Sequence, residues 1–214
     1  QRRFLSDGSI FSKNRWSIPI HIEEGNHERS ILMKSQKSVV SLNNIDSNFI
    51  VNSGRYGFYR VQYDDNSLAQ LELLIDEKIL NHVDRWSLQN DLFSQCVSGT
   101  KQIQEYLDFT TSYHDEDNYI TLQNLAQNLY HLYKLTRKEK FSDEIRTYTA
   151  QFLGTIFDRL GWDSQKNEKH TNALLRSFVI TALGKLGDKE ILNEARKRFN
   201  KFLKNKNSLA ADLQ

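Results

Sequence analysis

The hydrophobic periodicity of this chain changes once, near residue 64, and that change restricts its fold more than any other sequence feature. Before this point apolar residues tend to alternate with polar ones, and after it they follow helical spacing. Gly54 and Gly57 allow a turn with positive φ at the change, and residues 58–63 alternate between two faces as a strand does. We therefore predict a β part that passes directly into an α part, with almost no linker.

Residues 1–65 are predicted to form a small β-sandwich domain. The strand pattern is clearest at residues 16–23, where apolar side chains occupy alternate positions. Pro19 cannot donate a ladder hydrogen bond, so we expect this strand at a sheet edge or with Pro19 facing solvent. Several short strands within about 60 residues are typical of a β-sandwich. Further strands are predicted at residues 31–33, 39–42, 49–51 and 58–63.

Residues 66–214 are predicted to form an α-helical domain. Their apolar stripes indicate about seven amphipathic helices joined by short turns, and short turns make neighbouring helices antiparallel. Stacked pairs of this kind form a HEAT- or armadillo-like superhelix. Residues 208–213 look like the start of another element, so we expect this domain to be truncated at its C-terminal end. The stripes lie at residues 67–80, 84–97, 103–109, 122–133, 141–160, 174–186 and 191–203.

Local signals mark several helix ends. Ser67 and Gln70 have the spacing of a capping box, which places the start of the first helix at Ser67. Gly161 is expected to end one long helix, and Gly187 with Asp188 to end the next helix and begin the last.

The composition is that of an ordinary soluble protein. Of the 214 residues, 38% are hydrophobic and 26% are charged, and the formal net charge is +2. This charge gives no reason to expect a nucleic-acid or membrane partner, and no apolar run approaches the ~20 residues of a membrane span. Cys96 is the only cysteine, so no disulfide can form within the chain, which fits a reducing, cytoplasmic location.

Several motifs follow one another along the chain. Residues 57–64 read Gly-Phe-Tyr-Arg-Val-Gln-Tyr-Asp, and residues 84–93 read Asp-Arg-Trp-Ser-Leu-Gln-Asn-Asp-Leu-Phe. Together with shorter matches, they resemble the zinc-dependent aminopeptidases of the gluzincin type, which include puromycin-sensitive enzymes, aminopeptidase N and archaeal tricorn-interacting enzymes. The shorter matches are Gln-Arg-Arg-Phe-Leu at 1–5, Trp-Ser-Ile-Pro-Ile at 16–20, Leu-Gly-Trp at 160–162, Leu-Arg at 175–176 and Gly-Asp at 187–188.

The resemblance implies an activity for the whole enzyme and a role for this region. The whole enzyme would remove N-terminal residues from peptides by zinc-activated attack of water. This C-terminal region, a β-sandwich and the start of a helical superhelix, would be non-catalytic and would shape and gate the peptide chamber. Expected partners are the enzyme's own catalytic domain, peptide substrates and, for the tricorn-interacting type, a larger protease complex. Since the chain begins with Gln1, we expect a piece of a longer protein.

The motifs that carry the chemistry of that family are missing from this sequence. His-Glu-x-x-His places two zinc ligands one helical turn apart. His27 is followed by Glu28, but position 31 is Ile and no two histidines here have the required spacing. The Gly-x-Met-x-Asn segment that holds the substrate amine is also missing, and Met33 is the only methionine. We therefore assign no catalytic and no metal-binding residue, leave substrate-binding residues unknown, and expect the chain alone to be inactive and to bind no zinc. The histidines are His21, His27, His82, His114, His131 and His170.

Two short features have both a functional and a structural interpretation. Residues 114–117, His-Asp-Glu-Asp, could form a metal loop, but they lack the carboxylate spacing of a calcium site, so a solvated loop with a helix cap is favoured. Cys96 could be a nucleophile, but it lies on an apolar stripe without a nearby histidine. A small buried hydrophobe is therefore the favoured interpretation.

Three larger groups are open to the same two interpretations. The basic residues between 196 and 206 could bind phosphate or nucleic acid, but a solvated helix end is the favoured interpretation. The apolar residues among them have the spacing of core positions. The polar residues Asp84, Arg85 and Asp91 could be functional, but capping and pairing across a contact are favoured. An aromatic group could form a ligand surface, but a sandwich core that meets the first helices is favoured. The members of the aromatic group are Tyr56, Phe58, Tyr59 and Tyr63. The apolar residues of the basic stretch are Phe199, Phe202 and Leu203.

A second hypothesis of a different class remains open. The chain could be a free-standing helical-repeat scaffold that binds another protein through a concave face. We expect the chain to begin and end within structural elements, which makes a free-standing scaffold the less favoured hypothesis. Peptide hydrolysis by a longer product of the same gene would favour the aminopeptidase hypothesis.

Overall fold

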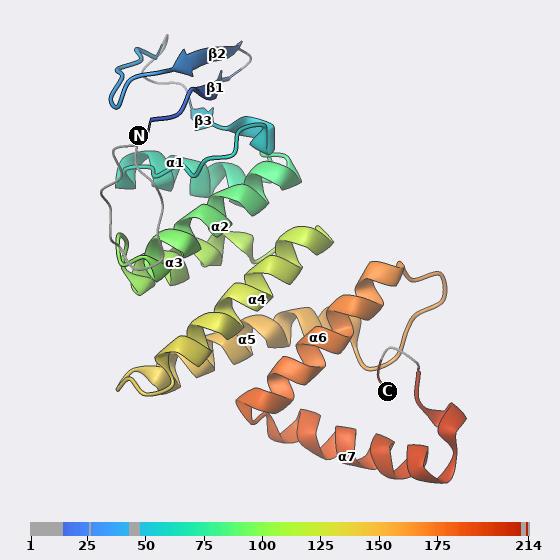
Figure 1. Cartoon of the computed structure of the whole chain (residues 1–214). Coiled ribbons are helices and arrows are strands. Elements are labelled where there is room, and N and C mark those ends of the chain that lie inside the picture. The colour runs from blue at the N-terminus through green and yellow to red at the C-terminus, as the bar shows by residue number, and fades with distance from the viewer. Residues whose placement is uncertain (1–14, 26, 43–47, 211–212, 214) are drawn as a thin grey trace. The chain divides into compact units, whose positions relative to one another are not determined.

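The computed structural model describes residues 15–25, 27–42, 48–210 and 213 (Figure 1). These residues form a small antiparallel sheet followed by seven α-helices, which confirms the prediction of a mainly helical chain with a small N-terminal β part. Contacts divide the chain into two compact units, Gln1–Thr121 and Leu122–Gln214. The predicted division into domains at residues 65 and 66 stays a prediction.

The sheet contains β1 (Ile18–Glu24), β2 (His27–Met33) and β3 (Phe49–Val51) in the order β2-β1-β3, with both pairs antiparallel. β1 and β2 pair along their whole length, whereas β3 pairs only with residues 22–24 of β1. Pro19 lies outside this short pairing and is exposed, so it faces solvent as predicted although β1 is the central strand. Ile22 and Ile50 are the buried apolar side chains of the sheet.

Two predicted strands do not form. Residues 39–42 have no regular structure, and Val39 is 98% exposed. Residues 58–63 do not form a strand because a helix takes their backbone hydrogen bonds. The Val61 amide donates to Asp91 Oδ2 at 3.0 Å, and the Val61 carbonyl accepts from Gln95 Nε2 at 2.8 Å. Within the described part of the chain, the β region is a single three-stranded sheet.

The first unit contains α1 (Asp65–Asp76), α2 (His82–Val97) and α3 (Ile103–Thr110), with the short 3-10 helices η1 (Ser53–Arg55) and η2 (Thr111–Tyr113). The predicted capping box at Ser67 is wrong. Asp64 caps α1 by accepting from the Ser67 amide at 2.8 Å, and its carboxylate also suits the positive end of the helix dipole. The largest buried side chains of this unit include Leu71, Tyr106, Phe109 and Tyr113.

The second unit begins within α4 (Tyr119–Thr136) and continues through α5 (Ser142–Leu160), α6 (His170–Leu186), α7 (Lys189–Lys204) and η3 (Lys206–Ser208). Gly161 ends α5 with φ of 61°, and Gly187 ends α6 with φ of 89°, as predicted. Asp188 then caps α7 by accepting from the Ile191 amide at 2.9 Å. The buried core of this unit includes Leu125, Leu129, Leu153, Ile156 and Val179.

A fully buried arginine joins two helices of the second unit. Arg176 of α6 donates from Nη2 to the Leu160 carbonyl at 3.1 Å and from Nε to the Gly161 carbonyl at 3.1 Å. It thereby bonds carbonyls at the C-terminal end of α5. Arg176 also forms an ion pair with Glu168, which precedes α6 and is nearly buried itself. Burial opposes the charge on Glu168, but the hydrogen bond from Arg176 keeps the pKa of Glu168 below its usual value.

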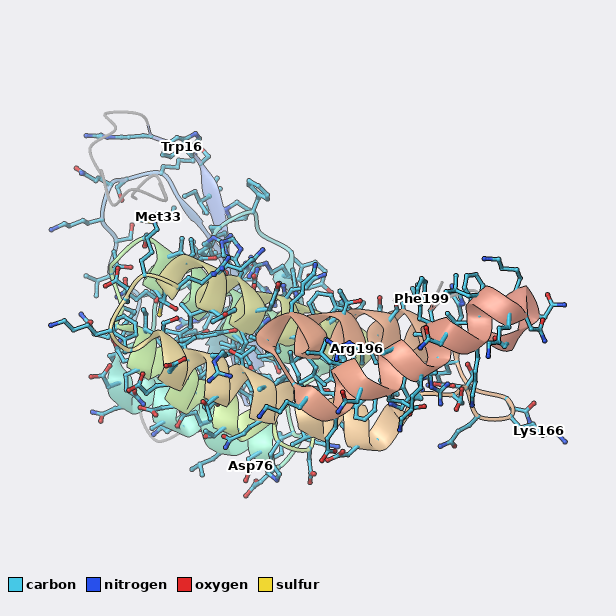
Figure 2. The ribbon with its side chains drawn as sticks, turned by 90° about the horizontal axis from the view of Figure 1, so that it is seen from below. Trp16, Met33, Asp76, Lys166, Arg196 and Phe199 are labelled. Carbon is cyan, nitrogen blue, oxygen red and sulfur yellow. The ribbon has the colours of Figure 1, made fainter. Side chains whose placement is uncertain are left out.

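We expect Arg176→Met to lower the free energy of unfolding by about 3–5 kcal/mol, because it leaves a carboxylate and helix-end carbonyls buried without their partner. Urea denaturation followed by circular dichroism measures this loss. Arg196→Met, at an exposed position on α7 (Figure 2), is the matched control and should change the value by less than about 0.5 kcal/mol. Equal losses in the two variants would contradict the assignment.

Candidate functional site

The turn between β3 and α1 has an unusual backbone. Asn52, Gly54 and Arg55 all have positive φ, between 57° and 67°. Asn52 is buried, and its side chain closes the turn by accepting from the Gly57 amide at 2.7 Å and donating to the Gly57 carbonyl at 3.0 Å. A Cβ on Gly57 would lie 2.0 Å from Cε1 of Tyr59, so this position has no room for a side chain. Of the two glycines predicted to allow positive φ, Gly54 adopts it, whereas Gly57 does not and is required for lack of space instead.

The first turn of α2 binds one side of this segment through Asp84. Oδ1 of Asp84 accepts from the Gly54 amide at 2.7 Å, and Oδ2 accepts from Ser53 Oγ at 3.1 Å. The same Ser53 Oγ lies 2.5 Å from Glu23 Oε2 of β1, so its single proton is shared between two carboxylates and the sheet, the turn and the helix form one hydrogen-bond network. The N-cap of α2 is Asn81, whose side chain donates to the same Asp84 carboxylate.

Asp91, about two helical turns further along α2, binds the other side. Its carboxylate accepts from Arg55 Nη1 at 2.9 Å, Arg60 Nη1 at 3.1 Å and the Val61 amide at 3.0 Å, and its side chain is 5% exposed. The Arg55 guanidinium also lies over the Trp86 ring, 5.2 Å from the ring centroid. These carboxylates hold backbone and arginine groups of the turn, so the predicted pairing across a contact is confirmed for Asp84 and Asp91. Neither caps a helix, because the N-cap of α2 is Asn81.

The aromatic side chains of this segment divide into two pairs. Tyr63 is buried and its hydroxyl accepts from the Val51 amide at 2.9 Å, while the Tyr59 hydroxyl accepts from the His21 amide at 3.2 Å. Burial raises the pKa of both tyrosines. Tyr56 and Phe58 are instead 83% and 111% exposed, so the prediction of a common core is wrong for these two. The turn presents them outward because its own backbone bonds to α2.

The loop at residues 114–117 is partly solvated, but Glu116 is buried. Glu116 accepts from Arg85 Nε at 2.6 Å and Nη2 at 2.8 Å, and also from the backbone amides of Asp117 and Asn118. Arg85 further donates to the Leu80 carbonyl at 2.6 Å. Burial opposes ionisation, but the hydrogen bonds from Arg85 and the amides keep the pKa of Glu116 below its usual value. Sequence reasoning missed this pair, because no local spacing links residues on α2 and in a later loop.

Two other predicted features keep their structural interpretation. Asn118 caps α4 by accepting from the Ile120 amide at 3.0 Å, as predicted for the end of the polar loop. Cys96 is half-buried, and its thiol lies 3.1 Å from the Gln102 carbonyl. Burial raises the pKa of Cys96 to about 12, so the thiol stays protonated and is a poor nucleophile.

The basic stretch at the end of α7 is less buried than its apolar spacing suggested. Phe199 and Leu203 are 55% and 57% exposed, so the prediction of core positions is wrong for both, and Figure 2 shows Phe199 on the outside of α7. Phe202 is half-buried, with Lys206 Nζ 4.3 Å from its ring centroid.

The described residues contain no group of three or more His, Cys, Asp or Glu side chains arranged to hold a metal ion. The zinc implied by the sequence resemblance therefore has no fitting site in the described ranges, and no chemical step is assigned to it here. In the same ranges, no helix is both long and apolar enough to cross a membrane.

Sequence comparison places the part of the chain from β3 through the helices in a known class, the C-terminal region of aminopeptidases. The chain belongs to the ERAP1-like C-terminal domain family, which matches residues 48–214. The predicted family resemblance is thereby confirmed.

Three relatives illustrate the match. Aminopeptidase M1 of Arabidopsis thaliana is 29% identical over 97% of this chain, and puromycin-sensitive aminopeptidase of Caenorhabditis elegans is 27% identical over 100%. Tricorn protease-interacting factor F2 of Thermoplasma acidophilum is 27% identical over 92%. The matches cover 26%, 24% and 24% of these proteins, so the chain spans about a quarter of their length.

We expect Asp91→Ala to lower the free energy of unfolding by about 3 kcal/mol. This is the lower end of the range for breaking a buried ion pair, because Arg55 and Arg60 can still reach solvent. Asp65→Ala is the control, since Asp65 is 88% exposed and pairs with Lys101 at the surface; its cost should stay below about 1 kcal/mol. Chemical denaturation of both variants gives the comparison. An Asp91→Ala protein as stable as the control would contradict the clamp, that is, the binding of the turn to α2 by Asp84 and Asp91.

Glu116 should contribute a pH-dependent part of the stability. Because its pKa is lower in the folded chain than its ordinary value of 4.5, its contribution is complete above that value and is lost as pH falls through the folded pKa. We expect Glu116→Gln to be less stable at neutral pH and to lose less further stability on acidification than the parent chain. The control is Asp117→Asn, at a 72% exposed carboxylate, for which the free energy of unfolding should vary with pH as in the parent when measured by urea titration from pH 7 to pH 3. If Glu116→Gln also showed the parent's pH dependence, the proposed role of the Arg85–Glu116 pair would be wrong.

Proposed function

We propose that this chain is the non-catalytic C-terminal region of a zinc aminopeptidase that removes N-terminal residues from peptides. The observation that carries the proposal is the family match over residues 48–214, together with relatives whose names are those of aminopeptidases. The zinc and the reactive groups would belong to residues outside this chain. The proposed location is the cytoplasm.

The proposed role of this region is to shape and gate the chamber in which a peptide is held. In this proposal residues 1–65 belong to a β-sandwich and residues 66–214 to a HEAT-like superhelix of stacked helical hairpins. Short connections support the second part, since five residues separate α4 from α5 and two separate α6 from α7. Such a region sorts substrates by size and charge and takes no part in bond chemistry.

The proposed partners are the enzyme's own catalytic domain, peptide substrates and a larger protease complex. The name of the Thermoplasma acidophilum relative, a tricorn protease-interacting factor, supports the last of these. Tyr56 and Phe58 are suited to contact the catalytic domain, because the clamp on α2 holds two exposed aromatic side chains on a fixed turn.

The test of the proposal compares this chain with the longest product of its gene. The longer protein should hydrolyse an amino-acid amide and lose this activity when a chelator removes zinc, whereas residues 1–214 alone should hydrolyse none. Cleavage by the isolated chain, or a gene product that lacks His-Glu-x-x-His and binds only a protein partner, would favour another function. The second result is the one expected for a free-standing scaffold.

A double variant tests the proposed contact. Tyr56→Ser with Phe58→Ser should leave the melting temperature of the 214-residue chain unchanged, because both side chains are exposed there, but should lower that of the full-length enzyme by several degrees. Val39→Ser, at another exposed apolar position, is the control for lost surface hydrophobicity. Equal melting temperatures for the variant and parent full-length enzymes would place the contact elsewhere.

A further inference from the structure

A cavity of about 490 Å³ lies within the second unit and has no part in the function proposed above. It is formed by the C-terminal half of α5, Trp162 just after α5, Leu183 near the end of α6, Asp188, and the N-terminal half of α7. Its volume falls in the range of roughly 300–1,000 Å³ that small-molecule and side-chain sites occupy. Phe157, Leu183 and Ile191 supply apolar surface, so the cavity offers burial to an aliphatic group.

Gly154 keeps one wall of this cavity open. It lies in the interior of α5, where glycine is less favourable than any residue except proline. No atom lies within 4 Å of the position that its Cβ would take, so packing within the protein does not require glycine there. A larger side chain at this position would enter the cavity, which makes Gly154 a convenient point at which to block it.

The charged groups that line the cavity are mostly acidic. Asp188 is engaged in capping α7, and Glu194 pairs with Lys197 at 3.7 Å. Asp158 and Glu190, one on each side of the cavity, are exposed and have no ion-pair partner among the described residues. With four carboxylates against the single ammonium of Lys197, the lining has a net negative charge and two carboxylates available to a ligand.

The rim of the same cavity already holds one cation of the protein itself. The Arg198 guanidinium lies over the Trp162 ring, 4.9 Å from its centroid, and forms two hydrogen bonds to Asp163 at 2.6 and 2.8 Å. Glu194 accepts from Arg198 Nε at 3.0 Å. An aromatic face with flanking carboxylates is the arrangement that stabilises a partly desolvated cation. The cavity beside it combines the Phe157 side chain with the carboxylates of Asp158 and Glu190, and the one cation in its lining, Lys197, is paired with Glu194.

We propose that this cavity binds an alkylammonium group on an aliphatic stem, with the lysine side chain of a peptide as the ligand. The stem would lie along Phe157 and Ile191, and the charged end would reach Asp158 and Glu190. A lysine fits both requirements, because it buries its methylene groups while its charged end stays near polar groups and water. The proposal concerns binding alone and holds whether or not the full-length protein is an aminopeptidase.

Isothermal titration calorimetry on the 214-residue chain tests this with three probes. The first is the blocked peptide acetyl-Gly-Gly-Lys-Gly-Gly-amide, the second has norleucine in place of lysine, and the third is the free diamine cadaverine. The lysine peptide should bind at least about tenfold more tightly than the norleucine peptide. If cadaverine binds as tightly as the lysine peptide, the ammonium group and its aliphatic stem are sufficient for binding. If the lysine peptide binds more tightly, the peptide backbone contributes and the ligand is a polypeptide.

Variants separate this site from general attraction to negative charge. Asp158→Asn with Glu190→Gln should weaken lysine-peptide binding about tenfold or more, and Gly154→Leu should abolish it while the chain remains folded by circular dichroism. Asp143→Asn with Glu144→Gln removes the same charge from the exposed start of α5 and should leave binding unchanged. Equal binding of both peptides, no binding at millimolar concentrations, or unchanged binding in Gly154→Leu would overturn the proposal.

Discussion

Two aspartates on α2 hold together the first unit of this protein. Asp84 binds the backbone of the turn that follows β3, and Asp91 binds two arginines and one amide of the segment that leads into α1. Both carboxylates are nearly buried, so their negative charge must be compensated, and the turn supplies the donors. The clamp also explains why residues 58–63 do not form a strand: their hydrogen-bonding groups are directed at a helix.

A buried arginine has a similar place in each unit. Arg85 of α2 bonds the carbonyl of Leu80 and pairs with Glu116, whereas Arg176 of α6 bonds the carbonyl of Leu160 and pairs with Glu168. In both cases the guanidinium reaches a carbonyl of the segment that precedes its helix and a glutamate outside the regular helices. Arginine suits this task because its planar fork can satisfy several acceptors at once, whereas lysine offers one compact charge. Helix connections in this protein are therefore held by buried ion pairs as well as by apolar packing.

These features describe a region whose charged groups maintain shape. The buried carboxylates are held by arginines or amides, the single thiol stays protonated, and the described histidines do not gather into a metal site. This agrees with membership of the ERAP1-like C-terminal domain family and with the proposed non-catalytic role. The exposed Tyr56 and Phe58 and the acidic cavity beside α7 are two of the surfaces that the internal packing leaves available for partners.

The sequence alone determined the elements whose signals are local. Helical periodicity after residue 64 predicted seven helices, and Gly161, Gly187 and Asp188 marked their ends, because φ preference and capping depend on neighbouring residues. Motif order was also sufficient for the family. Tertiary structure decided what depends on distant partners: the burial of Glu116 against Arg85, the exposure of Phe58, and the loss of the strand at 58–63 to Asp91. Alternation and spacing describe one segment at a time, whereas a hydrogen bond or a buried charge is settled by groups some thirty residues away.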